Sequence, residues 1–225
     1  PHSPSEMMLF LLPLQYLLWL QHDSPIYSQN ILIDSMILIE NTVFKKEDYT
    51  TLSLEVWEYE GCTFINCNFY DSHISDATMR NCTFQNCDLS LVKTSWSTFD
   101  TVQFIDCKMV GFRLDLCSTF LLWVSFENCI LKYAQFLNLP LKETQFIKCD
   151  LQEVDLTGAN FSSCIFDGCN FFGAIFQRTN LEKADFSSSF NYIIDPENNT
   201  ITKAKFSYTW IIGLLIKYDI EIETP

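Results

Sequence analysis

A phenylalanine that recurs every twenty residues organises the sequence. Nine phenylalanines share this register, with one step of 22 in the middle: Phe44, Phe64, Phe84, Phe104, Phe126, Phe146, Phe166, Phe186 and Phe206. A fixed period of this size is typical of a chain that repeats one structural unit and stacks the units along an axis. The register therefore predicts a solenoid.

A finer period of five runs inside each unit. From Phe64 to Phe186 an apolar residue recurs every five positions, with a break at Thr94, and a small or β-branched residue stands two positions before most of them. A period of five fits neither an α-helix, with 3.6 residues per turn, nor a flat strand, with a period of two. It fits a four-sided coil in which each side points one large and one small side chain inward.

Stacking such coils brings equivalent residues one strand spacing apart, roughly 4.7–4.9 Å. We therefore expect the phenylalanine rings to form a ladder of offset stacks. A second inward column is predicted on another face: Tyr59, Met79, Phe99, Leu121, Leu141, Phe161, Leu181 and Ile201. Both columns contain one step of 22, which predicts a single two-residue insertion within the segment Asp115 to Phe120, where one wall bulges.

Several five-residue strings resemble the A(D/N)LXX repeats of the pentapeptide-repeat family. They are ADFSS, VDLTG, ANFSS, CNFFG and CDLQE. The resemblance spans residues 44–206 and is strongest to the Qnr-type quinolone-resistance proteins. It implies an all-β fold, a right-handed quadrilateral parallel β-helix, over residues 36–206.

Residues 207–225 depart from the repeat. Ser207 or Thr209 can cap a short α-helix in which Trp210, Ile211, Leu214 and Leu215 have helical spacing, and a strand with Ile220 and Ile222 on one side is predicted to follow. The resemblance to Qnr-type proteins implies that this module forms a symmetric homodimer, with these six apolar residues as the candidate interface. A monomeric cap on the last coil is the alternative.

Residues 1–35 are a non-repeat N-terminal extension. The apolar run from Met7 to Leu20 is shorter than a standard membrane span of about twenty residues, and it lacks the basic start and cleavage site of a secretory signal. Met36 stands where a protein of this kind would start, so we expect residues 1–35 to be vector-derived or translated from upstream. A weak membrane anchor and an extension packed on the first coil are the alternatives.

Nine of the ten cysteines occupy the small inward position, and Cys117, in the inserted segment, does not. We expect free thiols, because side chains in register run parallel, whereas a disulfide needs its Cβ atoms drawn together. Metal binding is not expected, because His2, His22 and His73 are scattered along the chain. Buried, reduced thiols favour a cytoplasmic location.

The sequence predicts no enzyme and no cofactor, because no histidine is paired with a nucleophile and the acids do not converge. The resemblance to Qnr-type proteins implies instead a DNA mimic that binds DNA gyrase or topoisomerase IV, protects it from quinolones and does not itself bind nucleic acid. The competing hypothesis is a scaffold solenoid for protein–protein interaction without a topoisomerase role.

Charge supports mimicry over part of the chain. The net charge is −14, but residues 62–186 contribute 14 acids and 9 bases, whereas residues 1–61 hold 9 acids and 2 bases. No long loop interrupts the repeat. The candidate acidic partner surface is therefore at the start of the coil, and its residues are Glu47, Asp48, Glu55, Glu58 and Glu60.

Overall fold

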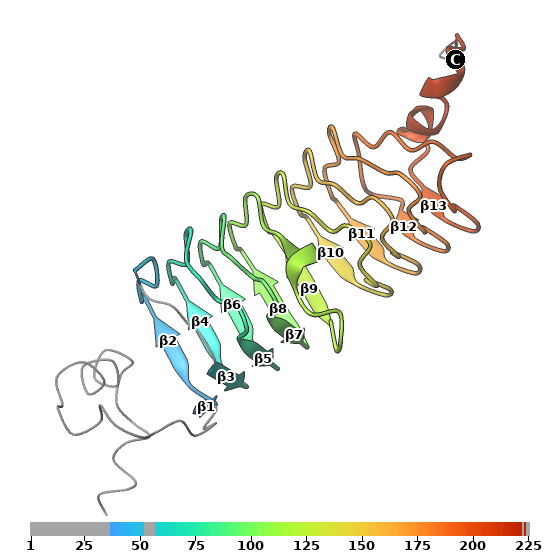
Figure 1. The fold of residues 1–225 in the computed structure, drawn as a ribbon. Coiled ribbons are helices and arrows are strands. Elements are labelled where there is room, and N and C mark those ends of the chain that lie inside the picture. Colours follow the sequence, from blue (N-terminus) through green and yellow to red (C-terminus); the bar gives the residue numbers. More distant parts are fainter. Residues whose placement is uncertain (1–36, 52–56, 222, 224–225) are drawn as a thin grey trace, which may run out of the picture. The chain divides into compact units, whose positions relative to one another are not determined.

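The computed structural model describes residues 37–51, 57–221 and 223. Contacts between Cα atoms divide the chain into residues 1–35 and residues 36–225. The run from Met7 to Leu20 lies outside the described residues. The second unit is a parallel β-solenoid whose coils stack along one axis, as the sequence predicts (Figure 1).

Two walls of the coil are β-sheets in which every strand pairs in parallel with the equivalent strand of the next coil. The first wall is a four-stranded sheet of β1 (Ile37–Glu40), β3 (Trp57–Glu60), β5 (Thr78–Arg80) and β7 (Thr98–Asp100). The second wall is a nine-stranded sheet of β2 (Val43–Lys45), β4 (Thr63–Ile65), β6 (Thr83–Gln85), β8 (Val102–Ile105), β9 (Val124–Glu127), β10 (Gln145–Ile147), β11 (Ile165–Asp167), β12 (Asp185–Phe186) and β13 (Lys205–Phe206).

The third and fourth walls are held by isolated parallel bridges. One column of bridges runs from Asp48 to Phe190 and marks the third wall, and a second column, between His73 and Ile175, marks the fourth. One 3-10 turn, η2 (Leu114–Leu116), lies on the fourth wall. In chain order the walls follow one another around the coil, so the first and third walls face in opposite directions.

The phenylalanine ladder fills the core behind the second wall. Successive rings from Phe44 to Phe206 are stacked, with centroids 4.7–5.5 Å apart and planes within 25° of parallel. All but the last are buried, and Phe206 at the end of the ladder is half-buried. Each stacked aromatic pair is worth about 0.5–1.5 kcal/mol beyond the burial of its surface.

The small inward position has a hydrogen-bonding role that the sequence analysis missed. Cys87 Sγ donates to the Phe64 carbonyl of the previous coil at 3.4 Å, and Ser189 Oγ donates to the Phe166 carbonyl at 2.7 Å. Thr94, which breaks the apolar period, is buried and donates to the Arg113 carbonyl at 2.7 Å. Cys, Ser and Thr can be buried in the core because each side-chain donor forms a hydrogen bond with a backbone carbonyl and is therefore not left unpaired.

The Asp or Asn of the repeat closes a local turn. Asp155 Oδ1 accepts from the Thr157 N–H at 2.9 Å, and Asn180 Oδ1 accepts from the Glu182 N–H at 3.0 Å. An amide or carboxylate oxygen that binds the backbone two residues on stabilises the bend where the coil changes direction. This contact gives a physical reason for D or N in the motif.

The structure places the two-residue insertion later than predicted. Ser118 N donates to the Ser97 carbonyl at 2.8 Å, so the chain still follows the twenty-residue register at Ser118. From Val124 onward, which pairs with Val102, equivalent residues are 22 apart across this coil. The bulge is therefore residues 119–122, after most of the segment Asp115 to Phe120. As a result Cys117 stays in register and is buried, against the prediction.

Leu121 also departs from the predicted second column. It has a left-handed backbone, with φ of 57°, and is 42% exposed, whereas Leu122 is buried. The other members of this column from Tyr59 to Leu181 are buried, and Ile201 is half-buried. The bulge coil turns Leu121 outward because two extra residues must leave the wall.

The bulge interrupts the ladder of the first wall, and the sequence accommodates this interruption with a proline. In later coils the residues equivalent to Pro140 donate to the coil before, as Asn160 N does to the Leu139 carbonyl at 2.8 Å. At position 140 the bulge replaces the regular wall of the coil before, where a backbone N–H would find its acceptor. Pro140 has no N–H, so no donor is left without a partner there.

The predicted C-terminal α-helix and strand are wrong for the described residues. The chain forms two 3-10 turns, η3 (Ile211–Leu214) and η4 (Ile216–Tyr218), and neither has a side-chain cap. Gly213 lies so close to the Tyr192 carbonyl that a Cβ atom there would overlap it, and its own carbonyl accepts from Ile194 N at 3.0 Å. Asp219, with φ of 48°, ends the second turn in a left-handed conformation, so tertiary contact overrides helical spacing.

Replacing Phe126, in the middle of the ladder, tests the core. Phe126→Ala removes a buried ring that stacks on Phe104 and Phe146, so the free energy of unfolding should fall by about 3–5 kcal/mol in urea titrations. Phe172→Ala, at a site 59% exposed, is the matched control and should change stability by less than about 0.5 kcal/mol. Equal effects of the two changes would contradict the ladder.

Candidate interaction surfaces

The residues of the candidate acidic surface lie on opposite walls. Glu47 and Asp48 are on the third wall, where Asp48 bridges to Asn68, and Glu58 and Glu60 are on β3 of the first wall. Glu55 lies outside the described residues. The structure therefore brings together two pairs of acids and does not form one patch from all of them.

Three of the acids, Asp48, Glu58 and Glu60, have side-chain contacts within their own coil or to the next one. Glu58 forms an ion pair with Arg80, and Glu60 Oε1 accepts from Asn81 Nδ2 at 2.7 Å. Asp48 Oδ1 accepts from the Thr50 N–H at 3.0 Å, and this backbone hydrogen bond lowers the pKa of the Asp48 carboxyl. The charge of Glu58 is therefore partly neutralised by Arg80.

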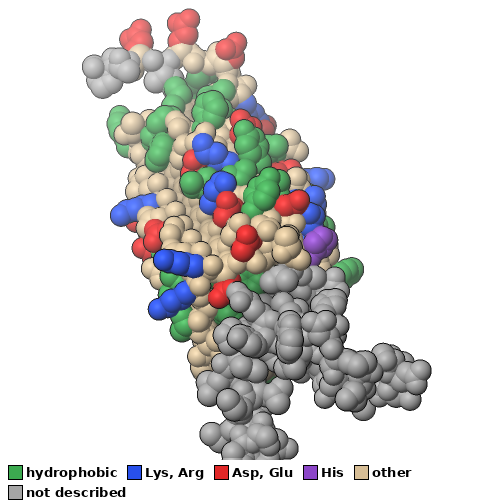
Figure 2. Space-filling model, turned by 90° about the vertical axis from the view of Figure 1, so that its left-hand side faces the viewer, with side chains coloured by type: hydrophobic (Ala, Val, Ile, Leu, Met, Phe, Trp, Pro, Cys, Tyr) green, Lys and Arg blue, Asp and Glu red, His purple; other side chains and the backbone are tan. Residues whose placement is uncertain are grey.

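Acids and bases alternate along the coil. Lys108 Nζ lies 3.0 Å from Asp88 Oδ2, and Lys205 Nζ lies 2.9 Å from Asp185 Oδ2, each pair joining neighbouring coils. Figure 2 shows the same mixture of acidic and basic side chains around hydrophobic ones on one face. Exposed pairs of this kind contribute about 0–1 kcal/mol each, so they decide surface potential more than stability.

The cysteines build no site. All ten are buried, and burial raises the pKa of the Cys164 thiol to about 12. No group of three or more His, Cys, Asp or Glu side chains in the described part of the chain is arranged to hold a metal ion. Among the same residues, no helix has the length and apolar character needed to cross a bilayer.

The candidate dimer residues have mixed exposure. Leu214 is buried, and Trp210 and Leu215 are half-buried, with the Trp210 ring 6.4 Å from the Phe190 ring. Ile211 is 40% exposed and Ile220 54%, and Ile222 lies outside the described residues. Further exposed apolar side chains surround them, and sequence reasoning did not include these: Tyr208, Ile212, Ile216 and Tyr218.

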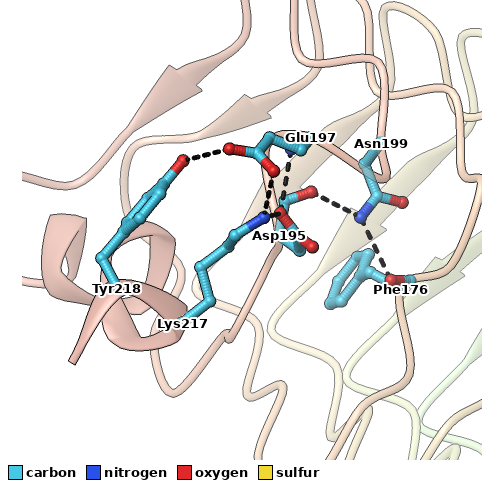
Figure 3. Close-up of polar contacts among 6 residues, drawn as sticks. All are labelled: Phe176, Asp195, Glu197, Asn199, Lys217 and Tyr218. Atoms are coloured by element: carbon cyan, nitrogen blue, oxygen red, sulfur yellow. Dashed lines mark hydrogen bonds and ion pairs between the residues drawn. The ribbon is translucent and has the colours of Figure 1, made fainter.

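A polar clasp joins the C-terminal turns to the loop before them (Figure 3). Lys217 Nζ donates to Asp195 Oδ1 at 2.6 Å and to Glu197 Oε2 at 2.7 Å, and the Tyr218 hydroxyl donates to Glu197 Oε1 at 3.0 Å. Asn199 Nδ2 ties the same loop to the Phe176 carbonyl at 3.1 Å. The clasp fixes the position of the exposed C-terminal apolar residues.

The bulge creates a surface that sequence reasoning missed. Five apolar side chains between 41% and 76% exposed lie on or beside it, and together they are called the bulge patch: Trp96, Leu116, Phe120, Leu121 and Trp123. The signal available in the sequence was that Trp96 and Leu116 occupy outward positions of the five-residue period. The inserted residues could not be assigned a direction, because the period is broken there.

The opposite charges of the clasp predict the pH range over which it stabilises the C-terminal turns. Lys217 lowers the pKa values of Asp195 and Glu197, and these acids raise the pKa of Lys217. The acids therefore stabilise the clasp above their unfolded pKa values, near 4, and this stabilisation is lost as pH falls through their lowered folded values. Lysine's contribution is present below its unfolded pKa, near 10.4, and is lost as pH rises through its raised folded value.

Protection of the backbone amides around residues 195–218 from hydrogen exchange, relative to the intrinsic exchange rate at each pH, should accordingly fall at acidic pH and in Lys217→Met at pH 7, while the protection of β4 to β11 stays unchanged. Lys203→Met, an exposed lysine with no ion pair among the described residues, is the control. Unchanged exchange of residues 195–218 in Lys217→Met would show that the clasp holds nothing.

Family models match most of the coil. A model of the pentapeptide repeat region matches residues 57–136, and a model of pentapeptide repeats matches residues 121–162 and 149–187. A search of curated proteins finds no significant match.

Solved structures with the same fold include two of trypsin-treated QnrB1 variants, described as a plasmid-mediated fluoroquinolone resistance protein. Each is 23% identical, with TM-scores of 0.61 and 0.59, and the matches cover 84% of this chain and 94% and 92% of theirs. Another is HetL from the cyanobacterium Nostoc sp., a pentapeptide repeat protein involved in heterocyst differentiation regulation. It is 17% identical with a TM-score of 0.52, and the match covers 76% of this chain and 86% of HetL.

Proposed function

Because the chain belongs to the pentapeptide-repeat family, we propose that it is a non-enzymatic cytoplasmic binding protein whose partner is a type II topoisomerase, DNA gyrase or topoisomerase IV. The observation that carries the proposal is the likeness to the fluoroquinolone resistance protein QnrB1 over 84% of this chain. In this role the acidic coil occupies the DNA site of the enzyme and protects it from quinolones without binding nucleic acid itself.

The charge of the coil limits how the mimicry works. Six coil steps from Phe64 to Phe186 cover about 29 Å, over which duplex DNA carries about 17 negative charges. Residues 62–186 carry a net charge of −5. The charge density of the coil is therefore too low to imitate the phosphate backbone along its whole length. In this proposal, recognition depends on local acidic surfaces such as the pair Glu58 and Glu60 on the first wall.

A scaffold role is the second candidate function. HetL has the same fold and is described as involved in heterocyst differentiation regulation, so this architecture is not restricted to one kind of partner. The ion pairs between coils favour this candidate, because they neutralise acids that a DNA mimic would present.

A supercoiling assay with purified gyrase and ciprofloxacin separates the two functions. Addition of the intact chain at micromolar concentration should restore supercoiling in the presence of the drug, and the effect should weaken at high salt because surface charges are screened. Glu60→Lys should reduce protection more than Glu127→Lys, a control that makes the same change of charge at an exposed site on β9 of the second wall. No effect of the chain on gyrase at any concentration would favour the scaffold role.

The C-terminal module is proposed to form a symmetric homodimer. The exposed isoleucines Ile211, Ile212, Ile216 and Ile220 lie within ten residues of one another, and the clasp holds this segment against the last coil. Burying such side chains against a second copy removes apolar surface from water.

Sedimentation equilibrium tests the dimer. The intact chain should have twice the mass of one chain, and Ile211→Glu with Ile220→Glu should shift it to the monomer, because two charges would be buried without partners. Ile165→Glu, at an equally exposed site on β11, should leave the mass unchanged. A monomeric parent chain would rule out this proposal.

A further inference from the structure

The residues of the bulge patch lie along the first wall on two neighbouring coils, from its corner with the fourth wall to its corner with the second. Trp96 and Leu116 are neighbours at the corner with the fourth wall, because Trp96 N donates to the Leu116 carbonyl at 3.0 Å. Trp123 stands at the corner with the second wall, where its N–H donates to the Phe99 carbonyl at 2.9 Å. Phe120 and Leu121 lie between them in the bulge. Figure 1 shows this segment directly before β9.

Stability does not account for the patch. Trp96 is 76% exposed and Phe120 75%, so neither ring contributes its surface to the core. Trp96 also holds a left-handed backbone, with φ of 63°, which is unfavourable for a bulky residue. Exposed apolar patches of this kind mark interaction sites, and Trp is enriched among the residues that dominate binding energy.

An acidic column leads up to the patch on the same wall. Glu40 pairs in register with Glu60, Glu60 with Arg80, and Arg80 with Asp100 on β7. The only base of this column, Arg80, is engaged by Glu58 in the neighbouring column. Asp100 follows Phe99, which is bonded to Trp123, so the acidic column ends at the edge of the bulge patch.

We propose that the bulge patch and the acidic column form one docking surface, and that its occupant is a segment of a partner protein with apolar side chains followed by Lys or Arg. Apolar side chains of the segment pack on Trp96, Phe120 and Trp123, and its bases reach Asp100 and Glu60. These acids are two coils apart, about 10 Å, which three extended residues span. The inference goes beyond the proposed function, because it applies to a topoisomerase and to a scaffold's partner alike.

Fluorescence anisotropy with labelled synthetic peptides tests this surface on the full chain. The probes are twelve-residue peptides with a Leu-Trp-Leu cluster followed by one Arg and one Lys, which stand one to six positions apart, and matched peptides with Glu in place of the bases or Ser in place of the apolar cluster. Binding should be tightest when the two bases stand about three positions apart, because that spacing matches the distance from Asp100 to Glu60. Both matched peptides should bind at least about tenfold more weakly.

Paired variants assign the binding to the wall. Phe120→Ser with Trp123→Ser should weaken binding by about tenfold or more, and Glu60→Gln with Asp100→Asn by about three- to tenfold with a reduced salt dependence. Tyr133→Ser with Phe172→Ser removes two rings of comparable exposure from the third wall and should leave binding unchanged. Circular dichroism of each variant checks that the solenoid is intact.

Three outcomes would overturn the inference. The first is no binding of any probe by the parent chain, and the second is equal binding by the first-wall and third-wall variants. The third is a loss of self-association in Phe120→Ser with Trp123→Ser, seen by sedimentation, because it would make a second copy the occupant. None of these results depends on gyrase, so the docking surface and the topoisomerase role can fail separately.

Discussion

The distance between neighbouring coils is the constraint on which the structure depends. Backbone hydrogen bonds between parallel strands set this distance, and it is also a favourable distance for stacked aromatic rings. The ladder from Phe44 to Phe206 satisfies both at once, with ring centroids 4.7–5.5 Å apart. Backbone pairing and core packing therefore support the same register, and a shift of one residue would lose both.

The same spacing governs the polar parts of the molecule. Many inward Cys, Ser and Thr side chains donate to a carbonyl of the coil before, as Cys87 does to Phe64, and Thr94 donates to one of the coil after. Outward acids and bases meet their equivalents one coil away, as Asp88 meets Lys108. Equivalent residues of successive coils therefore form columns. The members of one column share one kind of interaction, which is packing, hydrogen bonding or charge pairing. The surface departs from the repeat where a column changes or ends.

The bulge and the C-terminal turns are two such places, and the sequence predicts them to different extents. The insertion was detected from the step of 22, but its position was wrong, because the residues around it offer several apolar side chains that could face inward. Leu121 and Leu122 are adjacent and chemically equal, so only the hydrogen bonds of Ser118 and Val124 decide which one is buried. At the C-terminus, helical spacing predicted an α-helix, but the contact of Gly213 with Tyr192 favours tighter turns.

The strict period is enough to predict the four-sided coil, its core ladder and nine of its ten inward cysteines, because it leaves each side chain one direction to face. Which acids are neighbours depends on the folded coil: Glu47 and Glu58 are eleven residues apart yet on opposite walls, whereas Glu60 and Asp100 share a column. The tertiary structure also decided that the bulge turns aromatic side chains outward beside that column. Surface neighbours depend on how the coil closes and where it breaks, and local residue preferences do not encode either.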